Sequence, residues 1–133
     1  ALAGVDRIVH AGDVGRADIL QSLGAIAPVT VVRGNVDTDG WARQLPLTAM
    51  LKVDGLCIYA VHDIDTLDID PKAAGVQVVV FGHSHVPGVE ERDGVVYLNP
   101  GGAGPSRFTL PVTIAKLVVE HGRASAEIVE IAR

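Results

Sequence analysis

Residues Val76–His85 read Val-Gln-Val-Val-Val-Phe-Gly-His-Ser-His, and this stretch decides how the rest of the chain is interpreted. A run of β-branched and aromatic residues between turn signals is typical of a fully buried strand. Two histidines, His83 and His85, follow it. Residues two apart in an extended chain point the same way, so both imidazoles can aim at one spot. The stretch therefore predicts a metal site at the end of a buried strand.

Length and composition limit the class of protein. The chain has 133 residues, 48% of them hydrophobic, which suits one compact domain over residues 1–133. A net charge of -5, a pI near 5.4 and scattered basic residues argue against nucleic acid or an anionic membrane as the main partner. The single cysteine excludes an internal disulfide, and no apolar run approaches the roughly 20 residues that span a bilayer. We expect a cytoplasmic protein.

Hydrophobic patterning and turn signals predict more strands than helices. Asp54-Gly55 and Asp93-Gly94 are hairpin turn signals, and Asp70-Pro71 is typical of a helix start. We expect strands at residues 7–11, 29–32, 48–53, 56–61, 76–81, 95–98, 113–120 and 124–131, and helices at 16–23 and 70–74.

The order of these elements favours an α/β fold. Strands and helices alternate in the first half, which is typical of parallel strands buried on both faces, and the second half is rich in hairpins. An α/β sandwich with a mixed sheet, or with two facing sheets, fits both halves.

Residues of metal-ligand type follow four of the predicted strands. The strands lead into Gly12-Asp13, Gly34-Asn35, His62 and Gly82–His85. Loops at the carboxyl ends of strands in open α/β sheets converge on one crevice, where ligands bind. Oxygen donors mixed with imidazoles suit Mn²⁺, Fe²⁺ or Zn²⁺. We therefore predict one metal centre, with ligands Asp13, Asn35, His62, His83 and His85.

These blocks, in this order, resemble those of the calcineurin-like metallophosphoesterases. The sequences of Val32–Asn35 and Leu98–Gly101 resemble those of the small bacterial and archaeal phosphodiesterase branch of that family. The likeness covers nearly the whole chain from Asp6 onward. The resemblance implies an α/β fold, a sandwich of two mixed β-sheets flanked by helices in four layers (α/β/β/α).

The resemblance also implies roles for individual residues. Asp13 would bridge two divalent metal ions, with Asn35, His62 and His83 completing one site and His85 serving the other. Mn²⁺ is the expected ion, and Zn²⁺, Fe²⁺ and Ni²⁺ are the alternatives. The implied activity is phosphoesterase, foremost phosphodiesterase, in which a metal-bound hydroxide attacks a small phosphate ester in line. Asn35 and His83 would be catalytic, and the candidates for substrate binding are Arg33, Asn99 and Arg107.

The chain departs from the family pattern in three places. No Asp-x-His segment precedes Val5, so we expect an N-terminally truncated domain that lacks its first strand and has an incomplete first metal site. A missing central strand would leave strand edges exposed and favour a homo-oligomer. Val36 stands where many relatives carry a histidine that acts as general acid, and Asp63 stands where glycine is usual.

Each assignment has a plainer alternative. Asp13 and Asn35 also suit turns, His83 and His85 a polar strand end, and Asn99–Gly102 a tight turn. The alternative function is a non-catalytic scaffold on the same fold that binds metal or another protein, as in a retromer subunit that resembles this family. A third interpretation is a small α/β domain whose histidines bind adventitious metal.

Overall fold

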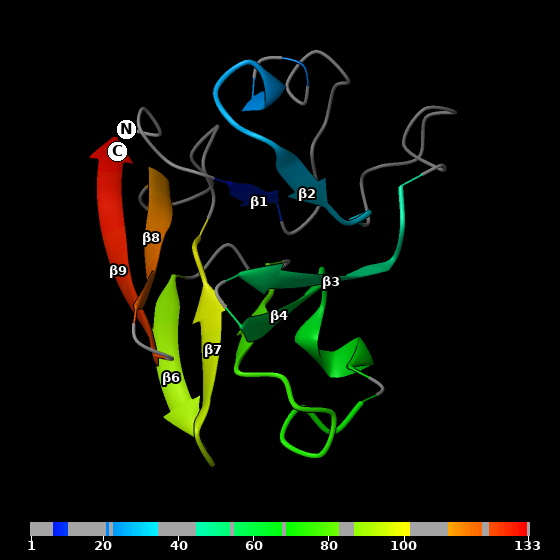
Figure 1. Ribbon diagram of the computed structural model, residues 1–133. Helices are drawn as coiled ribbons and strands as arrows, with labels where there is room; N and C mark the ends of the chain where they lie inside the picture. Colours follow the sequence, from blue (N-terminus) through cyan, green and yellow to red (C-terminus); the bar gives the residue numbers. More distant parts are fainter. Residues whose placement is uncertain are drawn as a thin grey trace.

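The computed structural model describes residues 7–10, 21, 23–34, 45–53, 55–67, 69–82, 87–101, 112–120 and 123–132 (Figure 1). Residues 21, 23 and 24 are helical. The strands are β1 (Ile8–His10), β2 (Val29–Val31), β3 (Thr48–Val53), β4 (Leu56–Val61), β5 (Val78–Val80), β6 (Gly88–Arg92), β7 (Val95–Asn99), β8 (Val112–Glu120) and β9 (Arg123–Ala132). A 3-10 turn, η2, spans Ile64–Thr66.

A five-stranded mixed sheet is the centre of the fold. Its strand order is β3-β4-β5-β7-β6, with β4, β5 and β7 parallel and the outer strands β3 and β6 antiparallel to their neighbours. All three residues of β5 are buried, because this strand has a neighbour on each side and a packed layer on each face. This explains the uninterrupted valine run.

The β6–β7 hairpin turns at Asp93-Gly94, as the sequence predicts. Both residues have positive φ, 53° and 78° respectively, which is the conformation of a two-residue type I′ turn. The twist of this turn matches that of the strands it joins, so the turn fixes the register of Arg92 opposite Val95.

Two apolar layers cover the two faces of the sheet. On one face, Ile58, Val78, Val80 and Leu98 pack against β1 and the β8–β9 pair. Figure 1 shows that pair alongside β6 and β7. On the other face, a cluster around Val79 packs against residues in and after η2. The predicted α/β sandwich with a mixed sheet is therefore confirmed.

The strands β8 and β9 show why a hairpin can form an outer layer. Alternate residues of β8 from Ala115 to Val119 are half-buried, while those between them are exposed, and β9 repeats the alternation. In the antiparallel register Leu117 lies opposite Ala126, so the half-buried side chains share one face. That face packs on the five-stranded sheet.

The predicted helix at residues 70–74 is wrong, because the segment forms only a single capped turn. The Ala74 N–H donates to the Asp70 carbonyl at 2.9 Å, and the Ala73 N–H approaches Asp70 Oδ1 at 3.5 Å. Gly75, with φ 76°, then ends the turn: its N–H donates to Lys72 O, and the Val76 N–H donates to Pro71 O. This pair of bonds is a Schellman motif, which stops a helix at the glycine.

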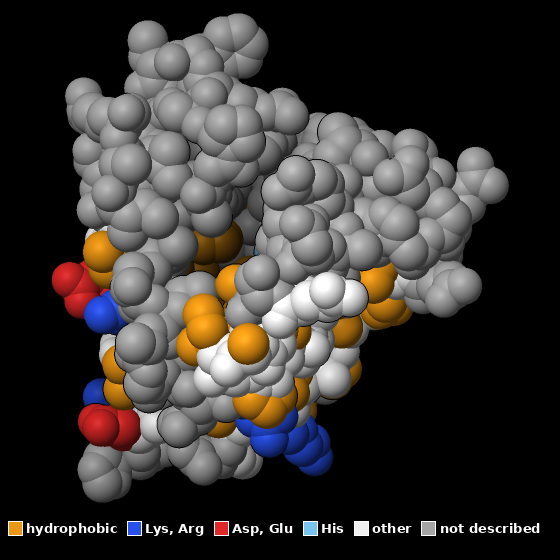
Figure 2. Space-filling model, turned by 90° about the horizontal axis from the view of Figure 1, so that it is seen from above, with side chains coloured by type: hydrophobic (Ala, Val, Ile, Leu, Met, Phe, Trp, Pro, Cys, Tyr) orange, Lys and Arg blue, Asp and Glu red, His pale blue; other side chains and the backbone are white. Residues whose placement is uncertain are grey.

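The surface of the described residues carries mixed charge. Figure 2 shows acidic and basic side chains next to each other along one margin of the face in view, with apolar side chains beside them. Within the part of the chain that the structure describes, no helix is long and apolar enough to cross a membrane.

Candidate active site

The carboxyl ends of three parallel strands are hydrogen-bonded to one another. The Gly82 N–H, just after β5, donates to the His62 carbonyl, just after β4, at 2.9 Å. The Phe81 N–H donates to the carbonyl of Leu98 in β7 at 3.0 Å. The residues that leave β4, β5 and β7 therefore start from one edge of the sheet.

The ends of β1 and β2 belong to the same region. The strands are parallel, and the Val32 N–H extends their pairing by donating to His10 O at 3.1 Å. The Arg33 N–H then donates to the carbonyl of Pro46, ahead of β3, at 2.7 Å. These bonds carry Arg33 and Gly34 to the side of His62, where all three line one pocket.

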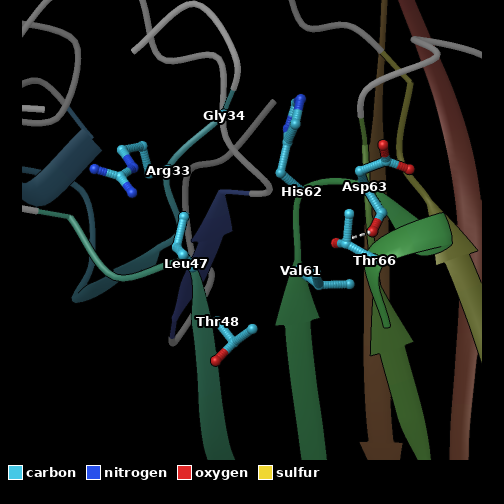
Figure 3. A pocket seen from close by; sticks show the side chains of 8 residues that line it. All are labelled: Arg33, Gly34, Leu47, Thr48, Val61, His62, Asp63 and Thr66. Atoms are coloured by element: carbon cyan, nitrogen blue, oxygen red, sulfur yellow. Dashed lines mark hydrogen bonds between the residues drawn. The ribbon is translucent and has the colours of Figure 1, made fainter. Parts of the chain in front are cut away.

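This pocket of about 520 Å³ lies where β2, β3 and β4 meet η2. In Figure 3 the Arg33 side chain and the His62 imidazole lie beyond the end of β4, with Arg33 on one side of His62 and Asp63 on the other. The pocket is lined by Arg33, Gly34, Leu47, Thr48, Val61, His62, Asp63 and Thr66.

His62 is the one predicted metal ligand within the described residues. It is 5% exposed, one of two buried polar residues of the described chain, and it follows the buried strand β4 directly. The chain turns into η2 after Asp63, whose Oδ1 accepts the Asp65 N–H at 3.0 Å and caps this turn. The Thr66 hydroxyl donates to the Asp63 carbonyl at 2.7 Å. These bonds fix the backbone directly after His62.

Asn99 is buried at the end of β7 with an exposure of 3%. Its Oδ1 accepts the Gly101 N–H at 2.9 Å, and its Nδ2 donates to the Gly82 carbonyl at 3.3 Å. The two ends of one side-chain amide therefore join the chain after β7 to the chain after β5.

The other predicted site residues, Asp13, Asn35, His83, His85 and Arg107, lie outside the described residues. Among those that are described, no group of three or more His, Cys, Asp and Glu side chains is placed to hold a metal ion. The residues directly before two of them are described, however. Gly34, before Asn35, lines the pocket, and Gly82, before His83, is hydrogen-bonded to His62. The backbone thus brings the strand ends together.

Sequence reasoning did not identify Thr48 and Thr66 as pocket residues. Thr48 begins a hairpin arm, and nothing local distinguishes it from other strand residues. Thr66 had an indirect signal, because Asp63, three residues earlier, is of a type preferred at the start of a helical turn.

The family assignment rests on sequence comparison. The family described as the calcineurin-like phosphoesterase superfamily domain matches residues 1–122 of the chain. A relative from Methanothermobacter thermautotrophicus, named "Probable metallophosphoesterase", is 30% identical over 136 aligned residues, which cover 97% of this chain and 78% of the relative. The chain belongs to the calcineurin-like phosphoesterase superfamily. Calcineurin-like phosphoesterases use divalent metal ions.

Solved structures share the fold of this phosphoesterase domain. An archaeal protein described as a novel phosphodiesterase matches with a TM-score of 0.74 and 22% identity over 94% of this chain and 84% of its own. Vps29 from Entamoeba histolytica, in a complex with zinc, matches with a TM-score of 0.73 and 21% identity over 95% of this chain and 82% of its own. These likenesses confirm the α/β calcineurin-like fold.

Proposed function

We propose that this chain is a metal-dependent phosphoesterase, most specifically a phosphodiesterase that acts on a small phosphate ester. The observation that carries the proposal is the pocket in which Arg33 and Gly34, after β2, meet His62, after β4. The chain after β2, which leads to Asn35, is bonded to Pro46 ahead of β3, and the chain after β5, which leads to His83, is bonded to His62 after β4. Family membership adds the class of chemistry.

The metal ions would be held by Asp13, Asn35, His62, His83 and His85. This donor set, with three imidazoles, one carboxylate and one amide oxygen, suits Mn²⁺, Fe²⁺ or Zn²⁺. Mn²⁺ is the proposed ion, as the family resemblance implies, with Zn²⁺, Fe²⁺ and Ni²⁺ as alternatives. His62 fits such a role because it is 5% exposed and borders a pocket at the carboxyl edge of the sheet. When bound, a pair of divalent ions supplies an activated water and neutralises the charge that develops on phosphorus.

The protein residues would orient the ester. Arg33 lines the same pocket as His62, and a guanidinium can bind two phosphate oxygens at once. Arg107 is a second candidate for that contact. Asn35 would bind a phosphate oxygen through its amide N–H in addition to holding a metal. His83 would be the second catalytic residue.

The test is hydrolysis of bis-p-nitrophenyl phosphate with Mn²⁺. It is run on this chain and on a form extended at its N-terminus by an Asp-x-His segment, which supplies two metal ligands in the family pattern. We expect turnover in the extended form, a loss of at least about 100-fold in kcat/KM in His83→Ala, and wild-type rates in His121→Ala. His121, between β8 and β9 in the sequence, is the matched histidine control. Equal rates in both variants, or no turnover in the extended wild type, would contradict the proposal.

The second candidate is a scaffold that binds metal or protein without catalysis. Its support is the fold shared with Vps29, one structure of which is complexed with zinc. Stoichiometric Mn²⁺ in the extended form without any turnover would favour it over the phosphoesterase.

A cytoplasmic location is proposed from the single cysteine, Cys57, which is free in the structure and suits a reducing compartment.

A further inference from the structure

Asn99 makes the side-chain connection between the two loops that leave β5 and β7. Its Oδ1 faces the Gly101 N–H at 2.9 Å, so this atom must be the acceptor of the amide. Its Nδ2 consequently faces the Gly82 carbonyl at 3.3 Å, where only a donor is favourable. The hydrogen-bond partners thus determine the orientation of the amide.

Gly82 is held from two sides. Its N–H donates to the His62 carbonyl at 2.9 Å, and its C=O accepts from Asn99. The first bond ties the chain after β5 to the chain after β4, and the second ties it to the chain after β7. Gly82 is also the residue directly before His83. The peptide group that carries the Gly82 carbonyl is the one that leads into His83.

We propose that Asn99 is a positioning residue that fixes the direction in which the chain enters the His83–His85 segment. It acts through the Gly82 carbonyl, in the peptide group that leads into His83. Its 3% exposure and its two backbone bonds favour this role over a contact with substrate. The role rests on the proposed function, because it assumes that His62, His83 and His85 bind metal.

The physical reason is the geometry that a metal site demands. Donor atoms must be held within a few tenths of an ångström, and residues behind the ligands commonly change metal affinity by about 10- to 100-fold. Glycine restricts its own backbone least of all residues, so a hydrogen bond to its carbonyl adds restraint that the side chain cannot provide. In this fold the donor of that bond is the side chain of Asn99.

Gln77 provides a matched control on the same strand ladder. Its Oε1 accepts the Cys57 N–H at 2.7 Å, so its side-chain amide also joins two chain segments, but just ahead of β5, at the opposite end from Asn99. Loss of either amide removes bonds that join neighbouring strands. Only Asn99 lies at the edge that carries the proposed ligands.

The experiment compares Asn99→Ala with Gln77→Ala in the N-terminally extended form. Mn²⁺ binding is followed by titration calorimetry, and kcat and KM are measured for bis-p-nitrophenyl phosphate. We expect Asn99→Ala to bind Mn²⁺ about 10-fold more weakly or worse and to lose kcat at saturating Mn²⁺ with KM within about two-fold. Gln77→Ala should keep the wild-type Mn²⁺ affinity even if its thermal midpoint falls as far as that of Asn99→Ala.

Asn99→Asp keeps the proposal testable if Asn99→Ala does not fold. It retains an acceptor for Gly101 but turns an oxygen toward the Gly82 carbonyl, so at pH 8 it should weaken Mn²⁺ binding as well. Exchange of the Gly82 amide hydrogen, measured without metal, should quicken in both Asn99 variants and stay unchanged in Gln77→Ala.

Three results would overturn the role of Asn99. One is an equal Mn²⁺ affinity in Asn99→Ala and Gln77→Ala. Another is a raised KM in Asn99→Ala with unchanged Mn²⁺ affinity, which would mean that Asn99 contacts the substrate. The third is a wild-type protein that binds no Mn²⁺, and this result alone also removes the proposed function, so the two failures can be told apart.

Discussion

At the scale of single residues, Arg33 is the clearest test of substrate recognition, because it is the basic residue of the pocket. Arg33→Ala should raise KM by about 10-fold or more with a smaller change in kcat, since a hydrogen bond to a charged group contributes about 1.5–3 kcal/mol. The KM of Arg33→Lys should fall between those of the wild type and Arg33→Ala, because lysine keeps the charge but cannot bind two oxygens as a planar fork. Steady-state kinetics with bis-p-nitrophenyl phosphate provide both parameters.

Arg92→Ala is the matched control for Arg33. Arg92 lies on β6, where its side chain is 57% exposed, contacts Glu90 at 3.4 Å and stacks on the Tyr97 ring at 4.2 Å. Removing it should leave KM unchanged. An equal rise in KM in both arginine variants would indicate a general electrostatic effect and contradict the phosphate contact.

Gly94 tests a backbone requirement. Its φ of 78° is a conformation that L side chains rarely adopt, and no atom lies within 4 Å of an added Cβ. Gly94→Ala should therefore destabilise the fold by about 1 kcal/mol through backbone strain alone. Gly88→Ala, also with open space and without positive φ, should change stability by less than about 0.5 kcal/mol. Urea unfolding compares them, and equal midpoints would contradict the type I′ turn.

At the scale of elements, β5 depends on its buried valines. Val79 is fully buried, with an exposure of 0%, and packs in the cluster with Tyr59 and Val61. Val79→Ala should lower the free energy of unfolding by about 1–3 kcal/mol, since it removes apolar contacts and leaves a cavity.

Val118 on β8 is the matched substitution for Val79. It is 48% exposed, so Val118→Ala should cost less than about 0.5 kcal/mol. Both free energies come from urea unfolding of the purified chain. A similar loss in the two variants would mean that β5 is not the centre of the core.

Elements with strong local signals could be predicted from the sequence. The arms of the β3–β4 hairpin match the expected residues 48–53 and 56–61, because alternation and an Asp-Gly turn act within a few residues. The ends of β5 could not be placed, because it is three residues long and its length depends on pairing with β4 and β7. The turn at residues 70–75 has a correct aspartate cap, but Gly75 ends it after one turn.

The site was predictable to a different degree. The meeting of strand ends at one edge follows from parallel pairing, and the bond between Gly82 and His62 agrees with it. The bonds of Asn99 were not predictable, because an Asn-Pro-Gly stretch indicates a turn but not which distant carbonyl its side chain contacts. All the metal ligands remain predictions; for His62 the structure shows the position, directly after β4 at the pocket.

At the scale of the whole molecule, we expect self-association through β3. This strand is an outer strand of the five-stranded sheet. Met50 on the strand is 53% exposed, and Leu47, directly ahead of the strand, is 61% exposed. An outer strand with exposed apolar side chains is a template for pairing with another chain. Multi-angle light scattering should show a mass that rises with concentration, and Met50→Lys should suppress the rise. A constant monomer mass in the wild type would contradict this expectation.

We expect side chains far apart in the sequence to meet around a common metal centre at the carboxyl edge of the sheet. The most direct measurement is anomalous X-ray diffraction from crystals of the chain soaked in Mn²⁺. We expect a metal peak within coordination distance of a ring nitrogen of His62, with Asp13, Asn35 and His83 as its other ligands. Saturating Mn²⁺ with no peak at His62, or with these four side chains on different sides of the molecule, would contradict it.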